Sequence, residues 1–324
     1  MNEAKTHADE IIGPVDGTVV PRFAGASTFV RLPTIDECRR YDIAVLGAPF
    51  DSGTSYRPGA RFGPLAVRTA SRNLRPSFHP DLGVAPLRAV QVVDAGDVPV
   101  NPFDMAVAVD QIRDHASDLL ANRSRLVTIG GDHTVALPLL RALHALHGPV
   151  ALVHFDAHLD TWDTYFGAPV THGTVFRRAF EEGLLVHDHS VHVGIRGPVY
   201  DELDLKDDAA FGFQIVRAGD IDRIGLNEIV ASVRSRVDDV PVYLSVDIDV
   251  LDPAFAPGTG TPEMGGLTSR ELLHLLRALD GLPLVGGDVV EVAPAYDHAE
   301  ITALAAATVV YDIVTLMAKE PLSF

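Results

Sequence analysis

Eight short apolar runs recur along the chain, and several of the segments between them have the spacing of amphipathic helices. The runs predict strands at residues 42–48, 89–95, 125–130, 150–156, 190–195, 213–217, 241–248 and 284–291. The clearest predicted helices cover residues 105–121, 135–147, 173–183 and 268–279. Regular strand–helix alternation predicts a parallel sheet whose strands are buried on both faces. Such a sheet either closes into a barrel or stays open between two helical layers, and the pattern by itself permits both.

The length of the chain, 324 residues, fits one α/β domain with eight strands. Residues 1–40 have little periodicity and contain Pro14, Pro21 and Pro33, so we predict an irregular N-terminal arm. No internal repeat, low-complexity tract or linker interrupts residues 41–324. These residues are therefore predicted to form a single domain.

The charge balance is acidic. The chain has 26 Lys and Arg against 44 Asp and Glu, a formal net charge of −18, and no patch of basic residues stands out in the sequence. Binding to the phosphates of nucleic acid requires Lys and Arg patches. We therefore expect no nucleic-acid partner, and the acidic balance is compatible with a cationic substrate.

Two features predict a cytoplasmic protein with no membrane partner. The first ten residues, MNEAKTHADE, are polar and acidic, which is unlike a secretory signal, and Cys38 is the only cysteine, which excludes a disulfide framework. The most apolar long stretch, residues 301–318, contains Thr302, Thr308 and Asp312. Polar positions of this kind favour a buried helix over a membrane span.

Carboxylates and one imidazole follow two of the predicted strands. The fourth strand runs into Asp156, His158 and Asp160, and the seventh runs into Asp247 and Asp249. Residues two apart on an extended strand point to the same face, so the members of each set are expected to share one face. The carboxyl ends of parallel strands meet at one edge of a sheet. We therefore expect both sets to lie close together.

A second histidine, His133, follows the third predicted strand in the run Gly130-Gly131-Asp132-His133. With it, the candidate ligands number two histidines and four aspartates, too many for one tetrahedral zinc ion. Six such ligands suit two divalent ions about 3.5–4 Å apart that share bridging carboxylates. Oxygen-rich ligation with some imidazole favours Mn²⁺. The structural alternative is that these aspartates cap helices and accept hydrogen bonds from loops.

The motifs resemble those of the ureohydrolase superfamily, the binuclear-manganese enzymes that include arginase and agmatinase. The resemblance extends from about residue 22 to residue 318, and the matching stretches are residues 130–133, 156–160, 245–253 and 289–294. It implies an α/β fold, a three-layer α/β/α sandwich with an eight-stranded, mostly parallel sheet, and so favours the open sheet over the barrel. It also implies two Mn²⁺ ions per chain.

The resemblance implies a role for each matching residue. One manganese ion would be held by His133, Asp156, Asp160 and Asp247, and the other by Asp156, His158, Asp247 and Asp249. The two ions would hold a bridging hydroxide at neutral pH, and Asp160 would accept its hydrogen bond. Glu291 would pair with the guanidinium group of the substrate. His172 would protonate the leaving amine.

The segment after the metal motif separates the members of the superfamily. Residues 161–170 lack the Asn and Ser with which arginases hold the α-carboxylate and α-amine of arginine, and are similar to agmatinases and guanidino-acid hydrolases. We expect hydrolysis of agmatine to putrescine and urea, with Trp162 and Asp163 in the substrate site. Arg57 and Arg61, in a predicted rim loop, keep a guanidino acid open as substrate, which would make the enzyme a guanidinobutyrase or guanidinopropionase. The structural alternative for these arginines is a salt bridge that stiffens the loop.

The resemblance also implies a homo-oligomer, a hexamer or trimer. An alternative from another class is a non-catalytic ureohydrolase-like protein with a regulatory role. Such relatives tend to lose metal ligands, whereas every ligand motif is present in this sequence. The content of bound metal would separate the two.

Overall fold

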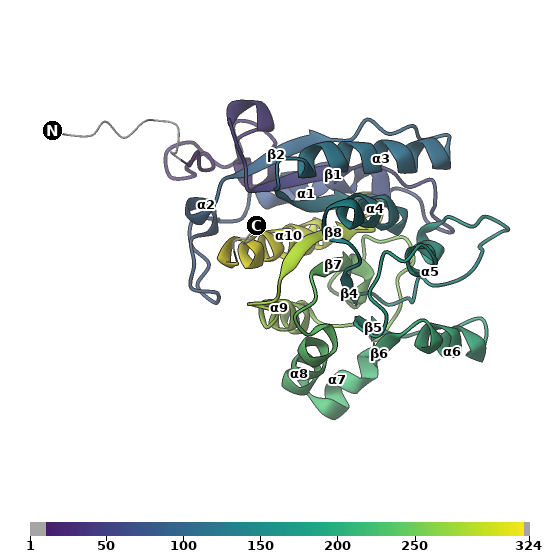
Figure 1. Ribbon diagram of the computed structural model, residues 1–324. Coiled ribbons are helices and arrows are strands. Elements are labelled where there is room, and N and C mark those ends of the chain that lie inside the picture. Colours follow the sequence, from purple (N-terminus) through teal and green to yellow (C-terminus); the bar gives the residue numbers. More distant parts are fainter. Residues whose placement is uncertain (1–10, 321–324) are drawn as a thin grey trace.

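The computed structural model describes residues 11–320 of the chain (Figure 1). The polar stretch from which we predicted the absence of a secretory signal, residues 1–10, lies outside the described residues. Residues 11–40 form turns and two short 3₁₀ helices, η2 (Phe29–Arg31) and η3 (Ile35–Glu37), ahead of the first strand.

The centre of the fold is one open sheet of eight strands. They are β1 (Ile43–Ala48), β2 (Val92–Asp97), β3 (Arg125–Gly130), β4 (Ala151–Phe155), β5 (Ser190–Ile195), β6 (Phe213–Arg217), β7 (Val242–Asp247) and β8 (Leu284–Val290). Their order is β2-β1-β3-β8-β7-β4-β5-β6, and every neighbouring pair is parallel. The fold class predicted for the chain, a three-layer sandwich, is confirmed, and the barrel is excluded.

Helices cover both faces of the sheet (Figure 1). They are α1 (Gly63–Ser71), α2 (Pro86–Ala89), α3 (Met105–Leu120), α4 (Ala136–His147), α5 (Val175–Glu181), α6 (Glu202–Ala210), α7 (Ala218–Ile224), α8 (Leu226–Val237), α9 (Ser269–Arg277) and α10 (Ile301–Lys319). One core cluster joins the sheet to α1, α2 and α7 to α10, and a second joins it to α3, α4 and α5.

Alternation along the strands feeds both cores. In β1, Ile43 and Val45 pack in the first core cluster, whereas Ala44 and Leu46 pack in the second. Successive side chains of a strand point to opposite faces, so a strand covered on both sides needs an unbroken apolar run. This requirement explains why the strands were recognisable in the sequence.

The apolar stretch near the C-terminus forms α10, a core helix. It is long and apolar enough to cross a membrane by composition, but 78% of its apolar window is buried inside the protein. Its Asp312 carboxylate is buried and pairs with His79 (2.8 Å) and with Arg277 (2.8 Å). A buried charge requires such partners. The buried helix predicted for residues 301–318 is therefore confirmed.

Candidate active site

The candidate residues follow four strands that are neighbours in the sheet. The order β3-β8-β7-β4 brings together the carboxyl ends that carry His133, Glu291, Asp247 and Asp156. The connection after β3 passes close under the loop after β1, because a Cβ atom on Gly131 would lie 1.7 Å from the carbonyl oxygen of Phe50. Only glycine fits this approach, which places His133 at the base of the site.

The aspartates reach the site from turns, which corrects the expectation that they share one face of an extended strand. Strand β4 ends at Phe155, and Asp156 accepts a hydrogen bond at Oδ1 from the backbone N–H of His158 (2.6 Å). Asp247 likewise accepts from the N–H of Asp249 (2.8 Å), which lies in the 3₁₀ helix η7 (Ile248–Val250). In each turn one carboxylate oxygen accepts the backbone N–H two residues on, and the carboxylate still faces the cluster.

The first group of ligand atoms surrounds His133. Its Nδ1 atom lies 3.0 Å from Asp160 Oδ2, 3.2 Å from Asp156 Oδ2 and 3.4 Å from Asp247 Oδ2. His133 and Asp156 are fully buried, and Asp160 and Asp247 nearly so. The backbone of Asp160 is left-handed (φ 57°), which is uncommon for a residue other than glycine and turns its carboxylate inward.

The second group surrounds His158. Its Nδ1 atom lies 3.1 Å from Asp249 Oδ2 and 3.3 Å from Asp156 Oδ1. The other oxygen of Asp249, Oδ1, accepts from the N–H of Ala157 (3.1 Å), which fixes the orientation of the carboxylate. Asp156 therefore contributes one oxygen to each group. All six residues predicted as metal ligands come together in these two groups.

Crowding of acids perturbs their protonation. Burial, with the neighbouring carboxylates, raises the pKa of Asp160, raises that of Asp249 to about 6, and raises that of Asp247 well above its usual value. Like charges this close in a buried site repel strongly. Divalent cations between the carboxylates would remove this cost.

The hydrogen bonds of His133 provide a further test of fit to a metal. Ser245 donates its hydroxyl proton to Asp288 Oδ1 (2.6 Å), so its lone pairs accept from Nε2–H of His133 (2.8 Å). In the neutral imidazole this leaves a lone pair on Nδ1 facing three carboxylates. Burial opposes the imidazolium, but without a cation between them those carboxylates raise the pKa of His133 well above its usual value. A metal ion at this position satisfies the lone pair and the carboxylates, and the chain from His133 through Ser245 to Asp288 is the support that metal-bound imidazoles require. The donors fit two divalent cations, with Asp156 shared.

Glu291 and His172 lie beside these groups. Glu291 Oε1 accepts from the backbone N–H of His133 (3.0 Å) and from Nδ1–H of His172 (3.1 Å). Its other oxygen, Oε2, is buried and has no hydrogen-bond partner among the described residues. A Cβ atom on Gly260 would lie 3.4 Å from Oε2, so the glycine leaves space next to it. The site thus offers a free carboxylate oxygen to a cationic group.

His172 also contacts the loop after β1. Its Nε2 atom lies 2.8 Å from the hydroxyl of Ser55 and 3.1 Å from the Ser55 N–H. Burial opposes the charged imidazolium, but the hydrogen bond to Glu291 and the charges of Asp160 and Asp132 outweigh it and raise the pKa of His172 to about 9. These interactions favour the imidazolium at neutral pH, and its Nε2–H can donate to the Ser55 hydroxyl.

The segment after the metal motif forms an aromatic wall at the edge of the site. Trp162 packs on Gly173, and its ring lies 5.7 Å from that of Tyr165 and 5.4 Å from that of Tyr200. Asp163 is exposed on this segment and pairs with Arg178 (2.7 Å). Trp162 is thus next to the His172 segment, whereas the Asp163 carboxylate is directed to a helix.

The two arginines of the rim loop differ. Arg61 pairs through Nε with the buried Asp51, as the salt-bridge alternative supposed. Arg57 has its guanidinium group against the rings of Tyr56 (5.7 Å) and Tyr296 (5.2 Å). The Arg57 carbonyl would lie 3.0 Å from a Cβ on Gly260, so Arg57 is close to the space beside Glu291.

The sequence reasoning gave no role to several residues that support the site. His154 is fully buried inside β4, where it reads as part of an apolar run, and its Nε2 lies 2.8 Å from Asp156 Oδ2. Burial lowers the pKa of His154 to about 3, so it is neutral. Ser55 lies in the loop after β1 and Asp288 lies inside β8, and neither belongs to a ligand motif of the sequence. A search for polar residues within the apolar runs would have found His154 and Asp288.

The comparisons with known proteins agree with this geometry. The sequence model described as the Arginase family matches residues 41–315. The chain is 46% identical to the agmatinase of Enterobacter sp. (strain 638) over 92% of this chain and 95% of that protein. It is 45% identical to the guanidinopropionase of Pseudomonas aeruginosa over 94% of this chain and 96% of that protein.

A solved structure is also similar to this chain. The proclavaminate amidino hydrolase of Streptomyces clavuligerus superposes with a TM-score of 0.88 and 44% sequence identity, over 93% of this chain and 99% of that one. Matches of this extent cover the sheet, the ligand motifs and Glu291 together. The chain therefore belongs to the arginase family.

Proposed function

We propose that this protein hydrolyses the guanidinium group of agmatine, giving putrescine and urea. The observation that carries the proposal is Glu291 Oε2, a buried carboxylate oxygen that no described side chain or backbone group satisfies, next to the two ligand groups. A guanidinium group is the cation that fits a carboxylate with directional, charge-assisted hydrogen bonds. The similarity to a named agmatinase supports the choice of substrate.

We further propose that the cations are two Mn²⁺ ions, held by His133, Asp156, His158, Asp160, Asp247 and Asp249. The predominance of carboxylate oxygens around a single proposed imidazole ligand, His133 in the first group and His158 in the second, supports manganese. When bound, such a pair of ions supplies Lewis-acid activation of a water molecule at neutral pH.

The residues of the chain perform the remaining steps. Glu291 Oε2 binds the guanidinium group and fixes its carbon next to the ligand groups. Asp160 accepts a hydrogen bond from the attacking water and orients it. His172, protonated at neutral pH, is the proton source for the leaving amine, which is a poor leaving group until protonated. Ser55, at hydrogen-bond distance from Nε2 of His172, can pass that proton onward.

The aromatic wall supports an amine tail. The rings of Trp162, Tyr165 and Tyr200 pack together next to Gly173, which follows His172, and cationic amines bind to aromatic ring faces. Arg57 favours a second candidate, a guanidino acid whose carboxylate tail would pair with its guanidinium group. This candidate corresponds to guanidinobutyrase or guanidinopropionase activity.

Urea release from a set of guanidino compounds tests the proposal. Purified protein loaded with Mn²⁺ is assayed with agmatine, guanidinobutyrate, guanidinopropionate and arginine at equal concentration. We expect the highest kcat/KM with agmatine. A preference for either guanidino acid, lost in Arg57→Met, would instead establish the second candidate. No urea from any of them would favour a non-catalytic, regulatory protein.

The pH dependence of turnover is expected to report His172. Its raised pKa means that the donor form predominates below about pH 9 and is lost as pH rises through that value. Bound cations nearby disfavour the imidazolium, so we expect kcat to fall on the alkaline side at or below pH 9. His172→Gln should lower kcat by roughly 100-fold and remove this alkaline limb. If kcat of His172→Gln still fell at the same alkaline pH as in wild type, a group other than His172 would cause the fall.

Assembly and location complete the proposal. We propose a homo-oligomer, a hexamer or trimer, in the cytoplasm; the acidic balance and the single cysteine support the location. Light scattering of the purified full-length chain tests the assembly, and a monomer would exclude it.

A further inference from the structure

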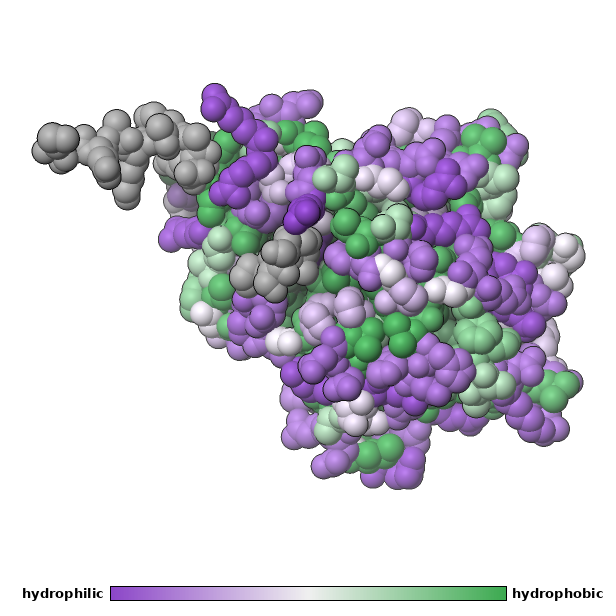
Figure 2. Space-filling view, in the orientation of Figure 1, coloured by the Kyte–Doolittle hydropathy of each residue, from purple (hydrophilic) through white to green (hydrophobic). Residues whose placement is uncertain are grey.

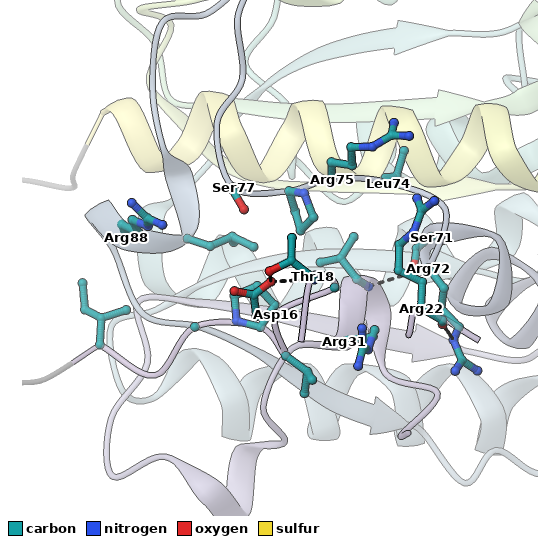
Figure 3. A pocket seen from close by; sticks show the side chains of 18 residues that line it. Asp16, Thr18, Arg22, Arg31, Ser71, Arg72, Leu74, Arg75, Ser77 and Arg88 are labelled. Atoms are coloured by element: carbon teal, nitrogen blue, oxygen red, sulfur yellow. Dashed lines mark hydrogen bonds between the residues drawn. The ribbon is translucent and has the colours of Figure 1, made fainter. Parts of the chain in front are cut away.

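A second cavity lies away from the candidate active site, between the N-terminal arm and the end of α1. Its volume is about 920 Å³, and its lining comes from residues 11–31, from residues 71–77 and from Leu87 and Arg88. Most small-molecule sites have volumes of roughly 300–1,000 Å³. We call it the arm cavity; Figure 3 shows its lining side chains.

The arm cavity is strongly basic. Five arginines line it, and Asp16 is the one carboxylate among its lining residues, all of which are described. The excess is therefore four positive charges in a chain whose net charge is −18. The arginines that line it are Arg22, Arg31, Arg72, Arg75 and Arg88. They are dispersed in the sequence, which is why no basic patch was visible there, and Figure 3 shows them around Asp16 and Thr18.

Two of the arginines join the arm to the segment after α1. Arg22 donates through Nη1 to the carbonyl of Asn73 (2.5 Å), and Arg72 donates through Nε to the carbonyl of Arg22 (2.8 Å). These bonds fasten the arm to the segment after α1. They do not require the other three arginines, of which Arg75 and Arg88 are exposed.

Arg31 is the strongest indication of a ligand. It is only 4% exposed, and while Nη1 donates to the carbonyl of Val20 (3.0 Å), Nε and Nη2 find no hydrogen-bond partner within the described part of the chain. A buried guanidinium with unsatisfied N–H groups is costly unless an anion pairs with it. Its backbone is left-handed (φ 64°), as is that of Val30 (φ 40°), so the chain holds this side chain at additional cost.

We propose that the arm cavity binds the phosphate group of a small phosphorylated metabolite. Guanidinium groups match phosphate oxygens bidentately, so the free Nε and Nη2 of Arg31 provide the donors, and Arg75 and Arg88 add positive charge to the lining. Apolar side chains at Val15, Leu74 and Leu87 line the same cavity and suit the organic part of the ligand. The site is independent of the proposed guanidinium hydrolysis.

Binding of AMP and of inorganic phosphate, measured by isothermal titration calorimetry on the full-length, Mn²⁺-loaded protein, tests the proposal. We expect one AMP per chain. Charge reversal in Arg75→Glu or in Arg88→Glu should weaken binding by at least about tenfold, since each puts a negative charge in place of a positive one on the lining of the cavity. Both side chains are exposed, so the variants should fold. Arg270→Glu, an exposed change on α9, is the matched control and should bind like wild type.

Two further variants make the result specific. Arg31→Met should abolish binding. Asp249→Ala should leave binding in the arm cavity unchanged, whereas it would weaken the binding of a phosphate held by metals in the active site. Tighter binding of AMP than of phosphate supports an organic ligand, and equal binding supports phosphate itself. The proposal is overturned if neither anion binds, or if the arginine variants bind as tightly as wild type.

Discussion

Asp249→Ala is expected to lower kcat/KM at least 1,000-fold, about 4 kcal/mol, while the fold is retained. The carboxylate contributes Oδ2 to the second ligand group, 3.1 Å from Nδ1 of His158, and its loss leaves that group with Asp156 as its other carboxylate. Elemental analysis after loading with Mn²⁺ and desalting should give about two ions per wild-type chain and about one per variant chain.

Stability of the metal-free protein gives an independent reading of the same carboxylate. Burial raises the pKa of Asp249 to about 6, so ionisation at neutral pH opposes folding when no cation is bound. Metal-free Asp249→Asn should therefore melt at the same temperature as metal-free wild type or higher, although it binds metal poorly. Asp222→Ala, exposed on α7, is the control and should change neither metal content nor activity. Two ions per chain and full activity in Asp249→Ala would refute its assignment as a ligand.

The fold was largely predictable because its strands are covered on both faces. A strand covered on both faces is apolar at most positions, as Ile43 to Leu46 are, and such runs are visible in one sequence. The order of the strands was not predictable, because β8 lies between β3 and β7 in the sheet although it is the last strand in the sequence. That insertion is what places Glu291 between His133 and Asp247.

The six residues predicted as metal ligands do lie together near strand ends, but the reason given for their spacing is partly wrong. Asp156 and Asp247 lie two residues before the next ligand because each carboxylate accepts a hydrogen bond from the N–H two residues on. The period of two belongs to the turn and not to an extended strand. A local hydrogen bond of this kind has the same spacing as strand alternation, so the sequence cannot distinguish them.

Supporting residues were harder to predict because their chemistry depends on contacts distant in the chain. His154 and Asp288 lie within apolar runs and act through Asp156 and through Ser245. The arginines of the arm cavity were hard to predict for the same reason: Arg31 and Arg88 are 57 positions apart in the sequence and line one cavity only in the folded chain. Sequence patterns report periodicity within one element, whereas these contacts arise between elements.

Glu291→Gln is expected to lower kcat/KM for agmatine roughly 100-fold, about 3 kcal/mol, with metal content unchanged. The N–H groups of His133 and His172 both donate to Oε1, so a glutamine must place its carbonyl oxygen there. Its NH₂ group then occupies the position of Oε2, where its N–H groups face the N–H groups of the substrate guanidinium. The variant thus replaces an attractive, charge-assisted contact with a repulsive one.

Steady-state kinetics and the pH profile together separate this role from a structural one. Loss of the carboxylate charge removes the main support for the imidazolium of His172, so the alkaline limb of kcat should move to lower pH in Glu291→Gln. A fault in folding or metal binding would lower activity without moving the limb. Glu182→Gln, which alters a partly exposed pair with Arg141, is the matched control and should leave both unchanged. If Glu291→Gln kept full kcat/KM and two ions per chain, the guanidinium group would have to bind elsewhere in the site.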